Sequence, residues 1–333
     1  MLDLPPGLDA QTGEAQLIAF HDHAAEEESF LDAVIEGLSR DPRAIPCRFL
    51  YDERGSALFD QICELPEYYP TRTETAILAT HASDIAAMAG PHAQLIELGS
   101  GSSIKVRILL RALDQPAAYV AVDVSREHLK RAAANLARDF PKIQVAAICA
   151  DYSAPFPLPE LPAAGRRVAF FPGSTIGNLE PDEALAFLRL WARRLGPDAA
   201  MLVGVDLKKD ADILNAAYDD AQGITARFSL NILARANAEL GADFDLDGFV
   251  HQARYNPDAG RVEIHLCSLE RQSARLAGRD FAFAAGERLH VEHSYKYAVS
   301  EFQALARRSG FEPTAVFTDP AQLFSMHYLT TPS

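Results

Sequence analysis

The sequence predicts an α/β protein with an open, doubly wound parallel sheet and a second domain of α+β type. Apolar strands alternate regularly with amphipathic helices between residues 95 and 205. The first strand of this series, Leu95–Leu98, is followed by a glycine turn and a helix. A long segment, residues 206–294, then separates the series from a final helix and two strands. These three observations predict a ligand-binding sheet that carries an inserted domain.

The composition is that of a globular chain that acts on a small molecule. Of its 333 residues 48% are hydrophobic and 23% are charged, which suffices for a large core in one or two domains. The formal charge of -15 and the lack of a basic run disfavour nucleic acids and anionic membranes as partners. The acidic start of the chain resembles no signal peptide, and no apolar stretch is long enough to span a bilayer. We therefore expect a monomeric, cytoplasmic protein.

The cysteines are scattered along the chain, at Cys47, Cys63, Cys149 and Cys267. No C-x-x-C pair and no metal-like histidine spacing accompanies them. We expect reduced thiols, no disulfide and no bound metal.

The first part of the chain predicts a helix and an aromatic loop. Apolar residues at helical spacing predict a helix over residues 17–38, after which Pro42 and Pro46 break the chain. The segment Leu65–Arg72 places two tyrosines between two prolines, which predicts an ordered loop that presents aromatic hydroxyls. These tyrosines could equally plug the surface of a domain. A helix over residues 74–88 then leads to the glycine turn.

The glycine turn predicts a nucleotide site. Glu97 lies in the first strand, Gly99 and Gly101 form the turn, and a helix follows. Glycines let a ligand approach the backbone, and the start of a helix offers free N–H groups. Dinucleotide enzymes carry a third glycine, but Ile104 stands at that position. The remaining E-x-G-x-G pattern resembles that of S-adenosylmethionine (SAM)-dependent methyltransferases.

Two aspartates end predicted strands beyond this turn. The expected strands and helices are, in order, Ala118–Val124, Glu127–Asp139, Ile143–Cys149, Val168–Phe171, Asp182–Arg194 and Ala200–Val205. Ligands of such sheets bind outside the carboxyl ends of the strands. There Asp123 can accept both ribose hydroxyls of a nucleoside, and Asp151 can accept a hydrogen bond from an adenine amino group. Each aspartate could instead only cap a helix or form a turn.

The loop after the fourth strand, residues 172–179, reads Pro-Gly-Ser-Thr-Ile-Gly-Asn-Leu. In methyltransferases this segment faces the transferred methyl group, and the Pro-Pro-aromatic signature of nucleic-acid amino-methylating enzymes is absent. Its backbone groups and the Asn178 amide suit a small polar substrate. The alternative is a tight turn that needs both glycines for positive φ.

The long segment predicts the second domain. Its expected elements are helices Ala211–Tyr218 and Phe228–Leu240, strands Phe249–Tyr255 and Arg261–Leu269, and a second strand pair around Gly286–Glu287. The first domain then ends with helix Val299–Arg308 and antiparallel strands Pro313–Phe317 and Leu323–Leu329. We predict a cofactor domain of residues 70–205 and 295–333. Residues 13–69 and 206–294 should form a substrate domain that closes over the open site.

Five motifs together carry a family resemblance. They are Tyr-Asp-Glu-Arg-Gly-Ser at 51–56, Leu-Pro-Glu-Tyr-Tyr-Pro-Thr-Arg at 65–72, Glu-Leu-Gly-Ser-Gly-Ser at 97–102, Gly-Ser-Thr-Ile-Gly-Asn-Leu at 173–179 and Ala-Tyr-Asp-Asp at 217–220. From about Phe49 to its end, the chain resembles the L-histidine Nα-methyltransferases of ergothioneine biosynthesis. The resemblance implies a Rossmann-like SAM-dependent methyltransferase sheet and successive transfers that give trimethylhistidine, or hercynine.

The resemblance also implies the site residues at matching positions. The expected SAM-binding residues are Gly99, Lys105, Asp123, Asp151 and Tyr152. The expected histidine-binding residues are Tyr68, Asn178, Tyr218, Glu292 and Ser294, with Tyr51 and Gly173 nearby. This chain departs from the bacterial pattern at Ile264, where the family has Met beside the substrate, and at Tyr152, where it has an adenine-contacting Phe.

The chemistry needs positioning more than a strong base. An α-ammonium with a pKa of about 8 loses its proton readily, and no His–Asp pair presents itself, so the base stays unassigned. Asn178, Gly173 and Tyr51 are expected to position the reacting groups. Asn178 and Tyr218 can hold the substrate carboxylate, and tyrosine faces can stabilise the methylated cation.

Substrate choice is expected to depend on the strand around Glu292. Alternation along a strand points Glu292 and Ser294 to one face, where they can meet the two nitrogens of an imidazole. The alternative is that both side chains are simply solvated. Two other functions stay open: a methyltransferase for another amino acid such as tryptophan, and a dehydrogenase or non-catalytic nucleotide-binding module.

Overall fold

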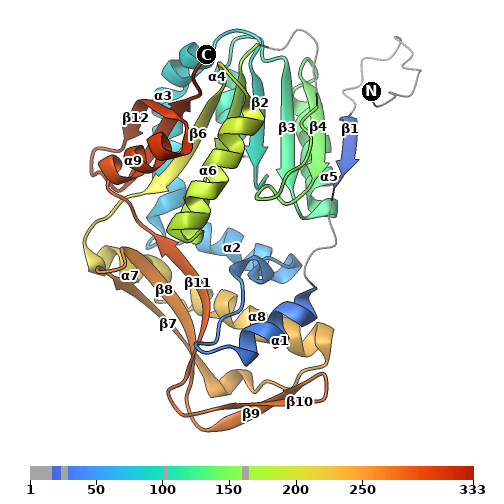
Figure 1. Ribbon diagram of the computed structural model, residues 1–333, viewed down its shortest axis with the longest axis vertical. Helices are drawn as coiled ribbons and strands as arrows, with labels where there is room; N and C mark the ends of the chain where they lie inside the picture. Colours follow the sequence, from blue (N-terminus) through green and yellow to red (C-terminus); the bar gives the residue numbers. More distant parts are fainter. Residues whose placement is uncertain (1–16, 24–28, 101–103, 160–164) are drawn as a thin grey trace.

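An eight-stranded sheet forms the upper body of the molecule in Figure 1. The computed structural model describes residues 17–23, 29–100, 104–159 and 165–333. The strand order is β1 (Leu17–Asp22), β4 (Gln144–Cys149), β3 (Ala118–Asp123), β2 (Gln94–Leu98), β5 (Arg167–Phe171), β6 (Ala200–Asp206), β13 (Phe324–Thr330), β12 (Glu312–Thr318). The first six are parallel, whereas β13 runs antiparallel to both of its neighbours. The predicted doubly wound sheet with an antiparallel end is confirmed.

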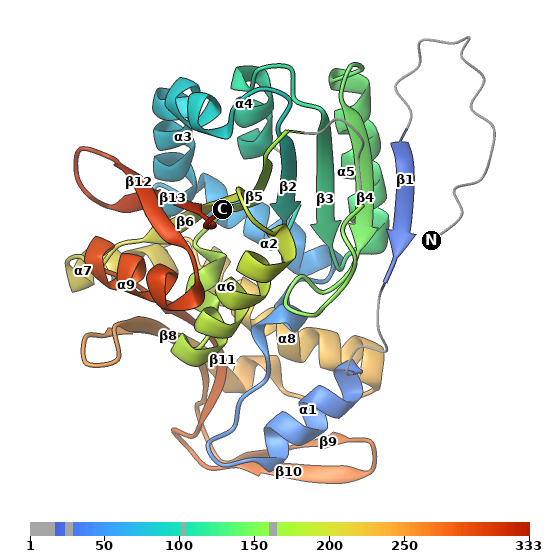
Figure 2. The same cartoon turned by 45° about the horizontal axis from the view of Figure 1, so that its top comes forward.

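Helices cover both faces of this sheet, as Figure 2 shows. They are α3 (Tyr69–Ala89), α4 (Ile104–Ala112), α5 (Arg126–Asp139), α6 (Pro181–Leu195) and α9 (Val299–Ser309). The first three share one core with the sheet, and α6 and α9 share the other, which contains the fully buried Trp191. Strands covered on both sides are rich in apolar residues, as β3 is, and every residue of β2 is buried. The carboxyl ends of the parallel strands face the lower body, as Figure 1 shows.

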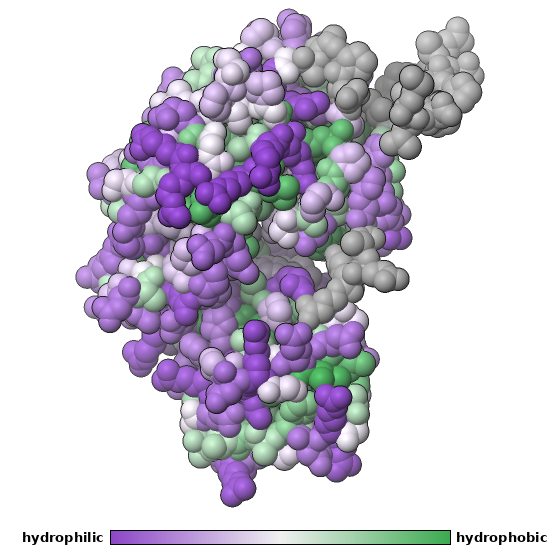
Figure 3. Space-filling view, viewed as in Figure 1, coloured by the Kyte–Doolittle hydropathy of each residue, from purple (hydrophilic) through white to green (hydrophobic). Residues whose placement is uncertain are grey.

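The lower body is built on a three-stranded antiparallel sheet, β7 (Phe249–Asn256), β8 (Arg261–Ser268) and β11 (Arg288–Tyr295), with β8 central. A separate hairpin pairs β9 (Gln272–Leu276) with β10 (Arg279–Phe283). The helices are α1 (Phe30–Ser39), α2 (Glu53–Glu64), α7 (Ala211–Tyr218) and α8 (Ile224–Leu240). Short 3₁₀ turns lie at η1 (Cys47–Leu50), η2 (Thr175–Asn178) and η3 (Leu246–Gly248). Figure 3 shows the surface hollowed where the two bodies meet.

The hydrophobic cores divide in nearly the same way as the predicted domains. One core draws its buried residues from Phe30–Tyr69 and from Leu214–Val291, while the two cores around the large sheet draw theirs from 77–205 and 295–329. The predicted domain that starts at residue 13 includes residues 13–16 and 24–28, which lie outside the described residues. The division into two independently folding domains stays a prediction.

The expectation of one helix over residues 17–38 is wrong. Leu17–Asp22 forms β1, which pairs in parallel with β4 at the edge of the sheet, and the helix α1 begins only at Phe30. Pairing with an open strand edge supplied by the distant β4 outweighs a local helical pattern. Ser29 caps the start of α1 through a hydrogen bond from the Asp32 backbone N–H.

Two further expectations need correction. The loop expected to hold both tyrosines ends at Tyr68, because α3 already begins at Tyr69, and Pro70 fits its first turn, where no N–H partner is needed. The second strand pair does not turn around Gly286–Glu287. It turns at Ala277–Gly278, where both residues have positive φ, and β11 pairs with β8 instead of β10.

Within the described part of the chain, no helix combines the length and the apolar character needed to cross a bilayer.

Candidate functional site

The carboxyl ends of β2, β3 and β4 bring together four of the five residues expected to bind the cofactor. Gly99 follows β2 with a φ of 74°, and a Cβ built on it would lie 3.9 Å from the Tyr152 ring. Asp123 ends β3 and accepts a hydrogen bond from the Ser125 N–H at 2.8 Å. Asp151 follows β4 and accepts from the Ser153 N–H at 2.7 Å. Both aspartates therefore also shape turns, as the alternative allowed.

Tyr152 links these groups. Burial raises the pKa of its phenol, and the carboxylates of Asp123 and Asp151 raise that pKa further, so the ring lies near both. Its ring packs edge-on against Phe171, with centroids 5.6 Å apart, and its carbonyl accepts from the Trp191 indole N–H at 3.0 Å. Tyr152 is thus a fixed wall beside the glycine turn.

The glycine turn has the features of an adenosine site. Ile104, which begins α4, and Val124, which follows β3, are large apolar residues left 59% and 47% exposed. The Ser100 hydroxyl is buried and has no hydrogen-bond partner among the described residues. An apolar cradle with an unpaired buried hydroxyl, flanked by the Asp123 carboxylate, fits a nucleoside that carries polar substituents. Gly101 and Ser102 of the motif lie outside the described residues.

Lys105, the fifth expected cofactor residue, belongs to a buried polar link that sequence reasoning missed. Its ammonium forms an ion pair with Glu74 of α3, a residue with no exposed surface. The Glu74 carboxylate also accepts a hydrogen bond from the Gly173 N–H, with both oxygens at 3.0 Å. Glu74 therefore connects the start of α4 to the loop after β5.

The substrate half of the site joins the loop after β5 to the strand β11. Asn178 ends η2 in the upper body, and its side-chain amide donates to the Glu292 carboxylate of the lower body at 3.5 Å. Ser294 lies two residues further along β11 and receives a hydrogen bond from the Tyr218 hydroxyl at 3.1 Å. Residues separated by 114 positions in the chain are thereby brought into contact.

Close packing of η2 on β11 explains one glycine of the loop. A Cβ on Gly177 would lie 2.6 Å from the Tyr295 carbonyl oxygen and 3.3 Å from the Ser294 hydroxyl. The expectation that both glycines serve positive φ holds for Gly173, at 78°, but is wrong for Gly177. Gly177 is needed because any side chain would push Asn178 away from Glu292.

Aromatic side chains line the same region from the ends of η1 and α3 and from α7 and α8. Tyr51 packs edge-on against Phe228 at 5.3 Å between centroids, and Tyr68 packs edge-on against Tyr218 at 6.1 Å. Burial raises the pKa of Tyr51, and the negative charge of Glu292 raises it further, which places Tyr51 near that carboxylate. These tyrosines therefore stay neutral and present ring faces and hydroxyls.

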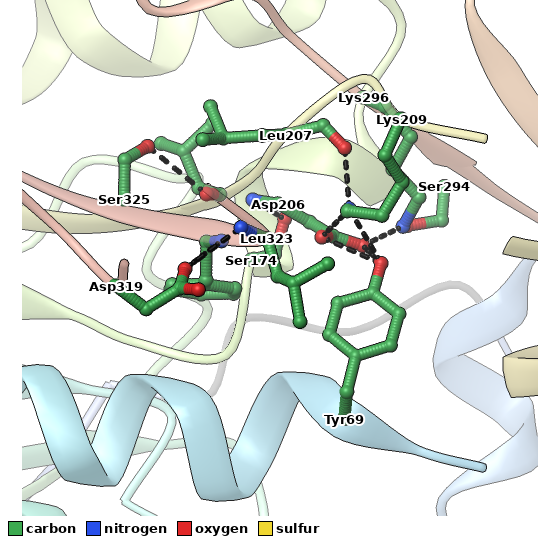
Figure 4. Close-up of polar contacts among 12 residues, drawn as sticks. Tyr69, Ser174, Asp206, Leu207, Lys209, Ser294, Lys296, Asp319, Leu323 and Ser325 are labelled. Atoms are coloured by element: carbon green, nitrogen blue, oxygen red, sulfur yellow. Dashed lines mark hydrogen bonds and ion pairs between the residues drawn. The ribbon is translucent and has the colours of Figure 1, made fainter. Parts of the chain in front are cut away.

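Sequence reasoning also missed a buried charged cluster beside the substrate half, drawn in Figure 4. Asp206 ends β6, has no exposed surface, and pairs with Lys209 at 2.6 Å and with Lys296 at 2.7 Å. The Tyr69 hydroxyl donates to the Asp206 carboxylate at 2.8 Å. The rule that selected Asp123 and Asp151, a carboxylate at the end of a parallel strand, would also have selected Asp206.

The protonation of Glu292 is shifted by its surroundings. Burial raises its pKa from 4.5 to about 7, although the Lys296 ammonium acts in the opposite direction. Because the folded-state pKa lies above the unfolded value, the folded protein binds the additional proton between these two pH values. The stability associated with the protonated form is present below about pH 4.5 and is lost as the pH rises through about 7.

Glu292→Gln should remove this dependence. From about pH 5 to 8 the ligand-free wild type should lose about 2 to 3 kcal/mol of unfolding free energy relative to the variant. Denaturant unfolding of both proteins across this range measures the difference. Glu312→Gln, on an exposed strand, controls for the loss of one carboxylate. If the difference in unfolding free energy between the wild type and Glu292→Gln stays constant with pH, the raised pKa of Glu292 is contradicted.

The structure thus places the apolar cradle at the ends of β2 to β4 next to a polar and aromatic cluster from η2, α7 and β11. No cluster of metal-binding side chains is found in the described ranges. The two halves meet at Asn178, which follows the strand that borders the cradle. Such an arrangement can hold two small molecules end to end and bring their reactive ends together.

Comparisons with known proteins identify the family. Residues 30–331 match the model described as "Histidine-specific methyltransferase, SAM-dependent". The chain is 43% identical over 295 residues to the histidine N-alpha-methyltransferase of Mycolicibacterium smegmatis, covering 87% of this chain and 91% of that protein. It is 40% identical to the protein of the same name from Mycobacterium tuberculosis, covering 88% and 92%. Ergothioneine biosynthesis protein 1 of Neurospora crassa is 31% identical, covering 93% of this chain and 36% of that protein. The chain therefore belongs to the family of histidine-specific, SAM-dependent methyltransferases.

Proposed function

We propose that this protein transfers methyl groups from SAM to the α-amine of L-histidine, three times in succession, and so forms hercynine for ergothioneine biosynthesis. The observation that carries the proposal is the contact of Asn178 with Glu292 at 3.5 Å. It joins the loop that faces the cofactor in this fold to a partly buried carboxylate suited to an imidazole. The histidine named in the family description disfavours the alternative of a tryptophan enzyme.

The residues at the carboxyl ends of β2 to β4 suit SAM. Asp123 would accept the ribose hydroxyls, Asp151 the adenine amino group, and Tyr152 would flank the base. Gly99 leaves the backbone accessible to the amino acid part, and Lys105 lies beside it. SAM supplies a methyl group on a positively charged sulfur. The chain needs only to position the acceptor, because no base of greater strength is required for an α-amine.

The other residues would hold the substrate. Asn178 would fix the histidine carboxylate. Tyr218, whose hydroxyl donates to Ser294, would border the substrate, and Tyr68 with Tyr51 would enclose the α-amine. Gly173 would border the path between the two ligands. As methyl groups accumulate, the nitrogen becomes a permanent cation, which tyrosine faces stabilise by roughly 0.5 to 2 kcal/mol. The same tyrosines would therefore favour completion of all three transfers.

Mass spectrometry of L-histidine incubated with the protein and SAM tests this function. We expect mono-, di- and trimethylated histidine in succession, with the trimethylated product last. Tryptophan and phenylalanine serve as competing substrates. Methylation of either in preference to histidine, or no methylation of histidine, would reject the proposal.

Asn178→Ala should show whether Asn178 binds the histidine substrate or only shapes its loop. Losing a hydrogen bond to a charged carboxylate should raise the KM for histidine about tenfold or more. SAM binding and the melting temperature should change little. Thr175→Ala removes a hydrogen bond within the same loop, to the Pro172 carbonyl at 2.9 Å, and reports the effect of loosening the loop alone. A large drop in the melting temperature of Asn178→Ala would show a structural role instead.

We also propose that the enzyme acts as a monomer in the cytoplasm. Asn178 contacts Glu292, and Tyr218 contacts Ser294, within a single chain, which supports a complete site in each molecule. The net charge of -15 disfavours binding to nucleic acid or to an anionic membrane. Light scattering coupled to size-exclusion chromatography tests the monomer, for which we expect a mass near 36.3 kDa.

A further inference from the structure

The ammonium group of Lys296 lies directly behind the proposed substrate pocket. Lys296 follows β11, its side chain has no exposed surface, and its three hydrogens all have acceptors. These acceptors are the Asp206 carboxylate at 2.7 Å, the Tyr218 hydroxyl at 2.8 Å and the Ser294 hydroxyl at 2.8 Å. An ammonium group has three donors and no acceptor, so both hydroxyl oxygens must accept from it.

The surroundings keep this lysine charged. Burial acts to lower the pKa of Lys296, but Asp206 and Tyr218 outweigh it, and the pKa lies above its usual value. The other titratable groups that face it are Lys209 and Tyr69, which share Asp206, and Glu292 on its own strand. Figure 4 shows the side chains of Tyr69, Lys209 and Lys296 converging on the Asp206 carboxylate. A buried cation with this many partners is fixed in position.

The hydrogen bonds already made by the Ser294 hydroxyl decide whether it can donate to a ligand or accept from one. Its oxygen accepts from Lys296 and from Tyr218, which fills both of its acceptor positions. Its own hydrogen has no acceptor among the residues that the structure describes. Ser294 can therefore only donate to a ligand in the pocket. Above its pKa of about 7, Glu292 is ionised, carries no hydrogen and can only accept.

We propose that Lys296 is a positioning residue that makes Ser294 a hydrogen-bond donor, so that the pocket accepts a neutral imidazole in one tautomer. The ring nitrogen without hydrogen faces Ser294, and the ring N–H faces Glu292. An imidazolium has no acceptor to offer Ser294. This inference rests on the proposed function, in which the two side chains bind the imidazole, and adds which groups donate and why.

Ring analogues of histidine provide the test. The two pyrrolylalanine isomers keep an N–H but carry C–H in place of the bare nitrogen, which leaves Ser294 without an acceptor. In competition assays read by mass spectrometry, the wild type should prefer histidine over the better isomer by about tenfold to a hundredfold in kcat/KM. A wild type that methylates both equally well overturns the inference without any variant.

Lys296→Met should reduce this preference about tenfold, because Ser294 then regains a free acceptor position and can turn its hydrogen toward Tyr218. Lys209→Met is the matched control, since it removes the same charge from the same Asp206 carboxylate but Lys209 touches neither Tyr218 nor Ser294. Its preference should equal that of the wild type. The inference is overturned if the preference for histidine over pyrrolylalanine is unchanged in Lys296→Met, or if it falls equally in Lys296→Met and Lys209→Met.

A double variant is designed to protect the fold when the charge of Lys296 is removed. Because Lys296→Met leaves a buried carboxylate with one cation fewer, the double variant Lys296→Met with Asp206→Asn is made as well, and it should show the same reduced preference. Ser294→Ala should lose the preference on its own, and adding Lys296→Met to it should change the ratio no further. Additive effects would indicate a purely structural lysine. Failure of the wild type to methylate histidine would reject the proposed function instead, which is a separate outcome.

Discussion

Glu292→Ala should reduce the preference for histidine over tryptophan by about tenfold or more, chiefly through loss of histidine turnover. The wild-type carboxylate is partly buried, and an aromatic ring without an N–H would leave it unpaired, at a cost of about 1 to 3 kcal/mol. Alanine removes that penalty together with the partner of the imidazole. Ile264, 1% exposed, lies opposite Glu292 in the register of β8 and β11 and already supplies an apolar wall.

Competition between histidine and tryptophan for methylation measures this effect in both proteins. Glu263→Ala is the matched control, because Glu263 is a carboxylate on the adjacent strand that pairs with Arg261 at 3.0 Å. We expect the control to discriminate as the wild type does. If wild type and Glu292→Ala discriminate equally, Glu292 does not recognise the imidazole, and the orientation inferred through Lys296 fails as well.

Asp123→Asn should weaken SAM binding about tenfold to a hundredfold, equivalent to about 1.5 to 3 kcal/mol for lost hydrogen bonds to a charged group. Asparagine keeps a carbonyl oxygen that can accept from the Ser125 N–H, so the turn after β3 should survive. In place of the second carboxylate oxygen, asparagine has an NH₂ group, which cannot accept a hydrogen bond from a ribose hydroxyl. The choice of asparagine thus separates cofactor binding from the turn that Asp123 also forms.

Isothermal titration calorimetry with SAM measures this loss, and melting temperature measures the fold. Asp139→Asn, an exposed carboxylate at the far end of α5 that pairs with Arg107, should bind SAM as the wild type does. A nicotinamide dinucleotide should bind neither protein measurably. Unchanged SAM affinity in Asp123→Asn would remove Asp123 from the cofactor site, and tight dinucleotide binding would favour the dehydrogenase alternative.

The elements of the large sheet were predictable because their signals are local. Buried parallel strands are short apolar runs, and turns and helices separate them, so Asp123 and Asp151 could be assigned to strand ends without the structure. The same logic would have included Asp206. The helix α7, Ala211–Tyr218, has the bounds that its pattern predicts.

Elements that depend on distant partners were not predictable in this way. Residues 17–22 have the apolar spacing of a helix and become a strand only because β4 offers an open edge. Likewise β11 joins β8 and not β10. In each case a pairing between remote segments contributes more than local propensity.

By itself, the sequence determined the fold class, the strand ends that border the nucleoside cradle, and the family resemblance from which the site residues were inferred. Only the tertiary structure decided which of these residues meet: Asn178 with Glu292 across the two bodies, and Lys296 with Asp206, Tyr218 and Ser294. The physical reason is that a strand end follows from local apolar periodicity, whereas a buried charge is tolerated only where packing places its partners around it. No pattern along the chain specifies those partners.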